Sequence, residues 1–201
     1  MKKLTIALIV LLGLIIVPVW TASAVSMPID LRDFYADPPV TVAADGSWAI
    51  LTEAEGYFPV LLSNDPFLGD PGIPVPDDLL TLNFSYFFTV GAGNTDNFQA
   101  MVFDGGAAGT ELNFIDIVSS GPAFAAGTVS WDLSGIDPLI IPLLGLEFQL
   151  LSFDSLFDSS LTISNVYMET ASAPVPEPAT MILVGTGLVG LLGLRRKKFR
   201  K

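Results

Sequence analysis

Residues 80–90 read Leu-Thr-Leu-Asn-Phe-Ser-Tyr-Phe-Phe-Thr-Val, and this stretch decides the fold class. Apolar and polar side chains alternate along it, so an extended chain would place the apolar ones on one face. That face would consist of Leu80, Leu82, Phe84, Tyr86, Phe88 and Val90. A period of two over eleven residues is typical of a half-buried β-strand and cannot form the stripe of an amphipathic helix. The same alternation returns around Trp131, with Val129 and Leu133 on the side of the tryptophan.

Short strands between turn signals fill the middle of the chain. The candidate strands are 40–43, 47–52, 58–63, 79–90, 97–103, 112–118, 127–133, 145–153 and 161–169. Glycine, proline, asparagine and aspartate mark the turns, as at Asp45-Gly46 and Gly121-Pro122. Eight or nine antiparallel strands in about 130 residues predict an all-β fold, a β-sandwich of the jelly-roll type over residues 41–170. Residues 25–40, which carry several prolines and acids, are expected to be an irregular lead-in.

The N-terminal segment has the three parts of a secretory signal peptide. Two lysines form a basic start, residues 4–19 are apolar, and Ala22-Ser23-Ala24 supplies small residues for cleavage. We therefore expect residues 1–24 to be a signal helix and the mature chain to begin at Val25. The alternative is that this helix remains as an uncleaved anchor.

The C-terminal segment joins an extended linker, an apolar stretch and a basic tail. Residues 171–178 are proline-rich and end in Pro176-Glu177-Pro178, and proline keeps such a linker out of helix and sheet. Residues 179–194 carry no charge and would span about 24 Å as a helix, which predicts a short transmembrane helix. Residues 195–201 are then expected to be a cytoplasmic tail, because basic residues next to a transmembrane helix stay on the cytoplasmic side of the membrane. These basic residues are Arg195, Arg196, Lys197, Lys198, Arg200 and Lys201.

This arrangement resembles the PEP-CTERM sorting signal of Gram-negative bacteria, in which the three parts are recognised by a membrane protease-transpeptidase called exosortase. The motif residues here are Val175, Pro176, Glu177, Pro178 and Ala179. The resemblance implies that exosortase is a partner and that the exported chain is held transiently in the inner membrane. Cleavage near the motif would then release the chain or attach it at the cell surface or in the extracellular matrix. The alternative is a plain single-pass anchor with a proline-rich stalk.

The charge of the chain is divided sharply along its length. The net charge is −12, but 21 acidic residues and the single basic residue Arg32 lie between Asp30 and Glu177. That region therefore carries −20, which would repel nucleic acids and anionic lipid headgroups. An acidic, well-solvated surface and a set of Ca²⁺-binding carboxylates are both compatible with this charge.

The chain contains no cysteine and no histidine. Disulfides, thiol chemistry, Ser-His-Asp triads and His/Cys zinc sites are therefore excluded. These absences remove most hydrolase mechanisms. A pair of carboxylates acting on a glycosidic bond stays open as an alternative, since no pair can be singled out among so many acids.

Two groups of acids are candidates for Ca²⁺, the only cofactor that the sequence suggests. The first comprises Asp65, Asp70, Asp77 and Asp78, which crowd a loop rich in proline and glycine. The second is Glu53 with Glu55, which would point the same way on a strand.

The middle region is also similar in pattern to carbohydrate-binding β-sandwich modules. In such modules the closing strand often supplies an aspartate to a structural Ca²⁺, but Ser164 stands at that position here. Trp48 and Tyr57 are the aromatic residues expected to be exposed and able to contact a sugar, whereas Trp131 and Tyr86 fall on core faces. We expect a non-enzymatic surface or matrix protein associated with exopolysaccharide or biofilm. The alternatives are a secreted polysaccharide-acting enzyme and a plain structural coat protein.

Overall fold

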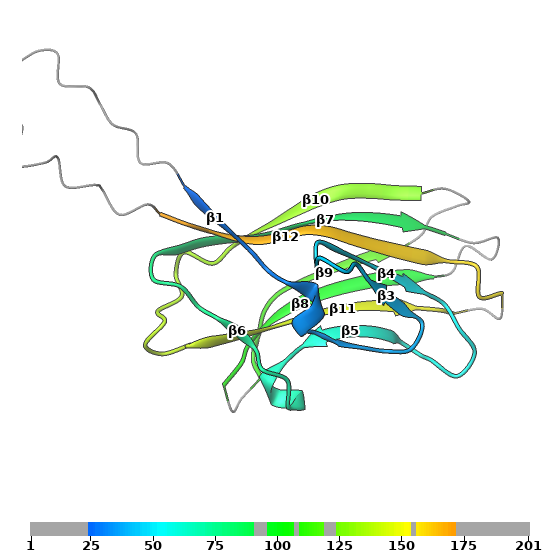
Figure 1. Cartoon of the computed structure of the whole chain (residues 1–201), viewed down its shortest axis with the longest axis horizontal. Helices are drawn as coiled ribbons and strands as arrows, with labels where there is room; N and C mark the ends of the chain where they lie inside the picture. Colours follow the sequence, from blue (N-terminus) through cyan, green and yellow to red (C-terminus); the bar gives the residue numbers. More distant parts are fainter. Residues whose placement is uncertain (1–23, 91–95, 107–108, 119–123, 154–155, 172–201) are drawn as a thin grey trace, which may run out of the picture. The chain divides into compact units, whose positions relative to one another are not determined.

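Two antiparallel sheets pack face to face in the computed structural model (Figure 1). The structure describes residues 24–90, 96–106, 109–118, 124–153 and 156–171, which belong to one compact unit, Ala24–Ala171. The expected signal helix and transmembrane helix lie outside these residues. Within them there is no α-helix, and no helix has the length and apolar character needed to cross a membrane.

The first sheet has the strand order β10-β7-β12-β4-β3, and β1 pairs with the part of β12 that β4 does not reach. Its strands are β10 (Phe124–Asp132), β7 (Leu79–Thr89), β12 (Ser160–Thr170), β4 (Trp48–Thr52), β3 (Val40–Val42) and β1 (Val25–Pro28). β7, which contains most of the alternating stretch 80–90, is the second strand of this sheet. It pairs with β10 along nine consecutive positions on one side and with β12 on the other.

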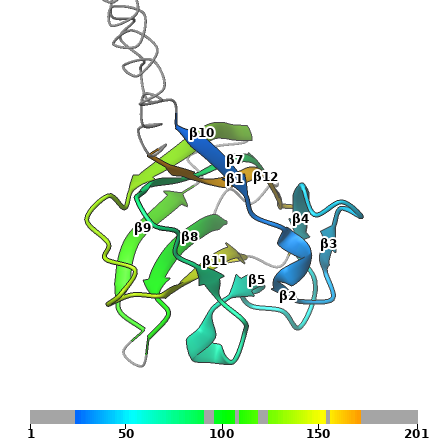
Figure 2. The same cartoon turned by 60° about the vertical axis from the view of Figure 1, so that its left-hand side comes forward.

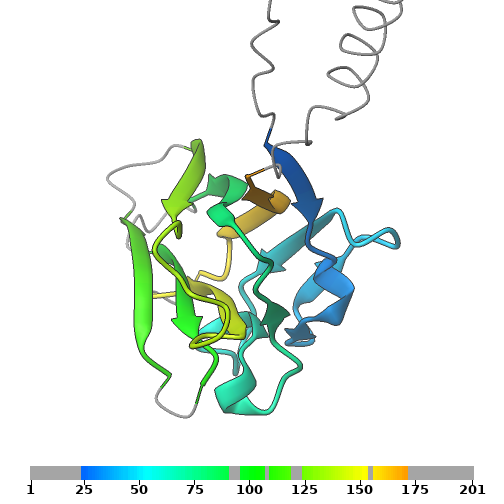
Figure 3. The same ribbon diagram turned by 90° about the vertical axis from the view of Figure 1, so that its left-hand side faces the viewer.

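The second sheet has the strand order β2-β5-β11-β8-β9, and β6 pairs with β11. Its strands are β2 (Tyr35–Ala36), β5 (Val60–Asn64), β11 (Leu143–Leu151), β8 (Asn97–Asp104), β9 (Glu111–Val118) and β6 (Ile73–Pro74). In Figures 2 and 3 the strands β10, β7 and β12 lie above β9, β8 and β11. Between β4 and β12 the chain changes sheet at most of its connections, which agrees with the predicted jelly-roll connectivity.

Phe84 lies at the centre of the core between the sheets. Its ring meets Trp131 of β10 edge-on at 5.3 Å and Phe148 of the opposite sheet at 5.1 Å between centroids. Phe84 and Phe148 are completely buried, and Trp131 is 7% exposed. The alternation along β7 therefore has the predicted orientation, with the Phe84 face inward and Phe87 turned outward and exposed.

All nine predicted strands are present, with ends shifted by up to three residues. Three short strands, β1, β2 and β6, lie outside the predicted ranges. The lead-in expected to be irregular contains two of them and a 3₁₀ turn, η1 (Leu31–Asp33), which the Asp30 carboxylate caps by accepting a hydrogen bond from the Arg32 N–H at 2.9 Å. This segment is ordered because Leu31 is completely buried in the core and β1 pairs with β12, the last strand of the domain.

Candidate functional site

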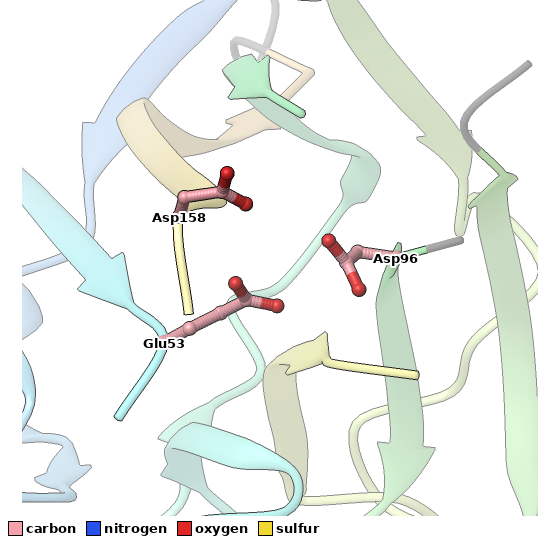
Figure 4. Close-up of side chains that lie close together, drawn as sticks. All are labelled: Glu53, Asp96 and Asp158. Carbon is pink, nitrogen blue, oxygen red and sulfur yellow. The ribbon is translucent and has the colours of Figure 1, made fainter. Parts of the chain in front are cut away.

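Three carboxylates meet at one end of the sandwich. Glu53 follows β4, Asp96 precedes β8, and Asp158 lies two residues before β12. Their side chains point toward one another from these three segments (Figure 4), and each offers a carboxylate oxygen within 4.8 Å of the others. Within the described part of the chain, this is the only group of three acidic residues so close together.

Ser159 links the two buried members of this group. The Asp96 carboxylate, completely buried, accepts hydrogen bonds from the Ser159 hydroxyl at 2.5 Å and the Phe153 N–H at 3.0 Å. The Glu53 carboxylate, 8% exposed, accepts a hydrogen bond from the Ser159 N–H at 2.8 Å. The cluster therefore fastens the segment before β12 to both β4 and β8.

The spacing of the three carboxylates suits a hard cation more than catalysis. Ca²⁺ takes oxygen ligands and bridges carboxylates at such distances. A glycosidase pair must flank a sugar bond, whereas Asp96 has no exposed surface and already accepts two hydrogen bonds. The basic residue Arg32 does not neutralise the cluster, because its side chain binds Asp30 at 2.5 Å and the Ala44 carbonyl at 3.0 Å. Hydrogen bonds to Asp30 from the Arg32 side chain and from the Arg32 N–H lower the pKa of Asp30 to about 2.

The acids of the predicted calcium loop lie in two separate places. Asp65 caps the 3₁₀ turn η2 (Pro66–Leu68), and its N–H donates to the Asp70 carboxylate at 3.2 Å. Asp77 and Asp78 are exposed in the turn that leads into β7. The structure thus brings Asp65 and Asp70 together but places Asp77 and Asp78 in a different turn, and calcium at these four residues stays a prediction.

Glu53 belongs to the second predicted acidic group, the pair Glu53 and Glu55, but its partners in the structure are different. Glu55 is exposed in the turn after Glu53, while Asp96 and Asp158 complete the cluster. Sequence reasoning missed both aspartates. In the sequence, Asp96 and Asp158 each lie just before a predicted strand. Only the sheet topology shows that these strands begin at the end of the sandwich where β4 ends.

The outward side of the first sheet is lined with hydroxyl groups and exposed aromatic rings, and we call it the hydroxyl face. Its serine and threonine members on β7, β10 and β12 are Thr81, Ser85, Thr89, Thr128, Ser130, Ser160, Thr162 and Ser164, and its exposed aromatic members are Trp48, Phe87 and Phe124. The register places Thr128, Ser85, Ser164 and Trp48 in one row across four strands. Within this row, the Ser85 and Thr128 hydroxyl oxygens are 3.4 Å apart.

The exposed aromatic rings lie at two places on the hydroxyl face. Phe87 of β7 stacks on Phe124 of β10, with ring centroids 5.5 Å apart and planes 23° from parallel. These two side chains are 46% and 68% exposed, and Trp48 on β4 is 38% exposed. Tyr57, the other residue expected to contact a sugar, is only partly exposed and packs against the core.

The hydroxyl face is almost free of charge, unlike the rest of the domain. Among the six strands of the first sheet, only Asp132 and Glu169 are charged, and both lie at the end where β1 pairs with β12. Glu169 already accepts a hydrogen bond from the Thr81 hydroxyl at 3.2 Å. The centre of the face therefore offers neutral hydrogen-bonding groups beside apolar rings.

The second sheet has a different outward side, with Glu147 near its middle. Glu147 is 6% exposed and lies in a cross-strand row with Met101 and Phe114. Burial raises the pKa of Glu147, the hydrogen bond from the Gln149 side chain opposes this, and the nearby Asp65 and Asp70 carboxylates add to it.

Glu147→Gln is expected to stabilise the protein at pH 7 but not below about pH 4. A carboxyl whose pKa is raised by folding binds more protons in the folded state, so the unfolding free energy falls as pH rises through the interval between the two pKa values. Glutamine is uncharged, so the substitution removes the cost of burying an ionised carboxylate. That cost applies in full only above this pH interval. Urea midpoints of both proteins at the two pH values measure this, and an equal difference at both would contradict it.

Comparison with known proteins identifies the C-terminal segment. Residues 174–197 match the PEP-CTERM protein-sorting motif. The chain carries a PEP-CTERM sorting signal. This signal implies that the protein is exported, processed by exosortase and anchored in a membrane on its way to display at the cell surface.

No curated protein matches the sequence. Among solved structures, the chain is similar to a CBM4 module with a TM-score of 0.37 and 9% identity, over 69% of this chain and 78% of that one. A CBM6 of a laminarinase from Zobellia galactanivorans gives a TM-score of 0.36 and 12% identity, over 74% and 100%. The K1 cleaved adhesin domain of Lys-gingipain from Porphyromonas gingivalis gives 0.37 and 10%, over 75% and 99%. Because these TM-scores are low, no ligand and no activity can be assigned to this chain from the three structures.

Proposed function

We propose that this PEP-CTERM protein is a non-enzymatic surface or extracellular-matrix protein of a Gram-negative bacterium, and that its jelly-roll domain binds exopolysaccharide through the hydroxyl face. The observation that carries the proposal is the combination of Trp48 and the Phe87–Phe124 pair with neutral hydroxyls on one exposed face. Sugar rings have apolar C–H faces that pack on aromatic rings and hydroxyls that exchange hydrogen bonds with polar side chains. Display at the cell surface, which the sorting signal implies, would expose this face to such polymers.

Trp48→Ala is expected to weaken retention on the exopolysaccharide of the producing bacterium by about tenfold, the size of effect that an anchoring tryptophan typically has. Phe114→Ala is the matched control, because Phe114 is similarly exposed, at 43%, but lies on the second sheet. Affinity electrophoresis through gels containing the polymer measures both variants. Equal retardation of Trp48→Ala and the parent protein would count against the hydroxyl face as the binding surface.

The same polysaccharides discriminate the alternatives. A glycoside hydrolase would release reducing ends from the polymer, whichever carboxylates acted. A plain coat protein would neither bind nor cleave. The proposal predicts retention without release of reducing ends.

A further inference from the structure

We infer that the hydroxyl face takes a neutral polysaccharide, laid across the strands from Trp48 to the Phe87–Phe124 pair. The inference rests on the proposed function and narrows it in two respects: the charge of the ligand and its path over the sheet.

The path follows from the strand register. Trp48 lies opposite Ser164, Ser164 lies opposite Ser85, and Phe87 is the next outward residue along β7. Neighbouring strands are about 4.8 Å apart, so about 10 Å separate β4 from β7 and about 14 Å separate β4 from β10. The two aromatic positions are therefore about 10–14 Å apart across the sheet, a distance that a short oligosaccharide can bridge and a single sugar ring cannot.

Hydroxyl groups occupy the space between the aromatic positions. Ser164 and Ser85 lie directly between Trp48 and β10, and Thr162 lies beside Phe87 on β12. Asn165, exposed at a bulge in β12, donates a hydrogen bond from its amide to the Ser85 hydroxyl at 3.4 Å. Side chains that both donate and accept suit the hydroxyls of a sugar, which also do both.

The inference that the ligand is neutral follows from the scarcity of basic side chains between Asp30 and Glu177. Uronate or sulfate groups call for lysine or arginine, and the only basic residue between Asp30 and Glu177 is Arg32, which is bound to Asp30. That region carries −20, so an anionic polymer would be repelled as it approached. A neutral polymer would not be repelled in this way.

The test is affinity electrophoresis and calorimetry with the full chain, purified in a detergent without a sugar headgroup. The probes are neutral β-glucan, xylan and galactomannan, and acidic polygalacturonate and alginate. We expect at least one neutral polymer to bind, with affinity falling about tenfold in Trp48→Ala and in Phe87→Ala but not in Phe114→Ala. Little change is expected between low and high salt, because a neutral ligand releases no counterions.

The outcomes separate this inference from the proposed function. Binding of the acidic polymers alone, with or without added Ca²⁺, would overturn the neutral ligand while leaving polysaccharide binding in place. Loss of affinity in only one of the two aromatic variants would overturn the path between them. Absence of binding to every polymer, including the native exopolysaccharide, would overturn the proposed function itself.

Discussion

Replacing Pro176, Glu177 and Pro178 together by alanine is expected to leave nearly all of the protein with its C-terminus at Lys201. The match to the PEP-CTERM motif spans these residues, and from sequence their prolines are expected to keep the linker extended, a conformation that a processing enzyme can bind. Intact mass spectrometry of protein recovered from cells and medium measures the C-terminus. The parent protein should instead end near Pro178.

The control for this experiment is Pro174→Ala, in the same linker but outside the Pro-Glu-Pro triplet. It should be processed like the parent protein. Continued processing of the triple variant would contradict the assignment of the triplet as the sorting determinant.

Phe84→Ala is expected to destabilise the domain by about 3–5 kcal/mol, the usual cost of truncating a buried phenylalanine. The ring is completely buried and makes edge-on contacts with both Trp131 and Phe148, so its removal leaves a cavity between the sheets. Urea unfolding followed by tryptophan fluorescence measures the change.

Phe87→Ala is the matched control, three residues along the same strand and on the opposite face. Because Phe87 is 46% exposed, its loss should cost less than about 1 kcal/mol. A larger cost at Phe87 than at Phe84 would mean that β7 is turned over, since a slip of one residue exchanges the two faces of a strand.

The long strands could be predicted from sequence because each carries its own period-two signal. The short ones could not. β2 and β6 are two residues each, too short for any period, and β1 exists because Val25 pairs with Thr170 at the other end of the domain. Nothing local in the proline-rich lead-in indicates that pairing.

The candidate site could be predicted only in part, for the same reason. Trp48 stands beside the Asp45-Gly46 turn, where sequence predicts an exposed side chain, and it is exposed. Phe87 interrupts the alternation of residues 80–90 as a large apolar side chain on the polar side, and such an exposed apolar side chain can mark a functional surface. Its partner Phe124 requires the register of β7 and β10, which no sequence pattern supplies.

The measurement that tests the central claim most directly is a two-dimensional NMR titration of the mature, processed protein with an oligosaccharide of the native exopolysaccharide. The account predicts chemical-shift changes centred on Trp48, Ser164, Ser85 and Phe87, with the second sheet around Phe114 unchanged. Shift changes centred on Phe114 and Glu147, or at the Glu53 end of the sandwich alone, would contradict it.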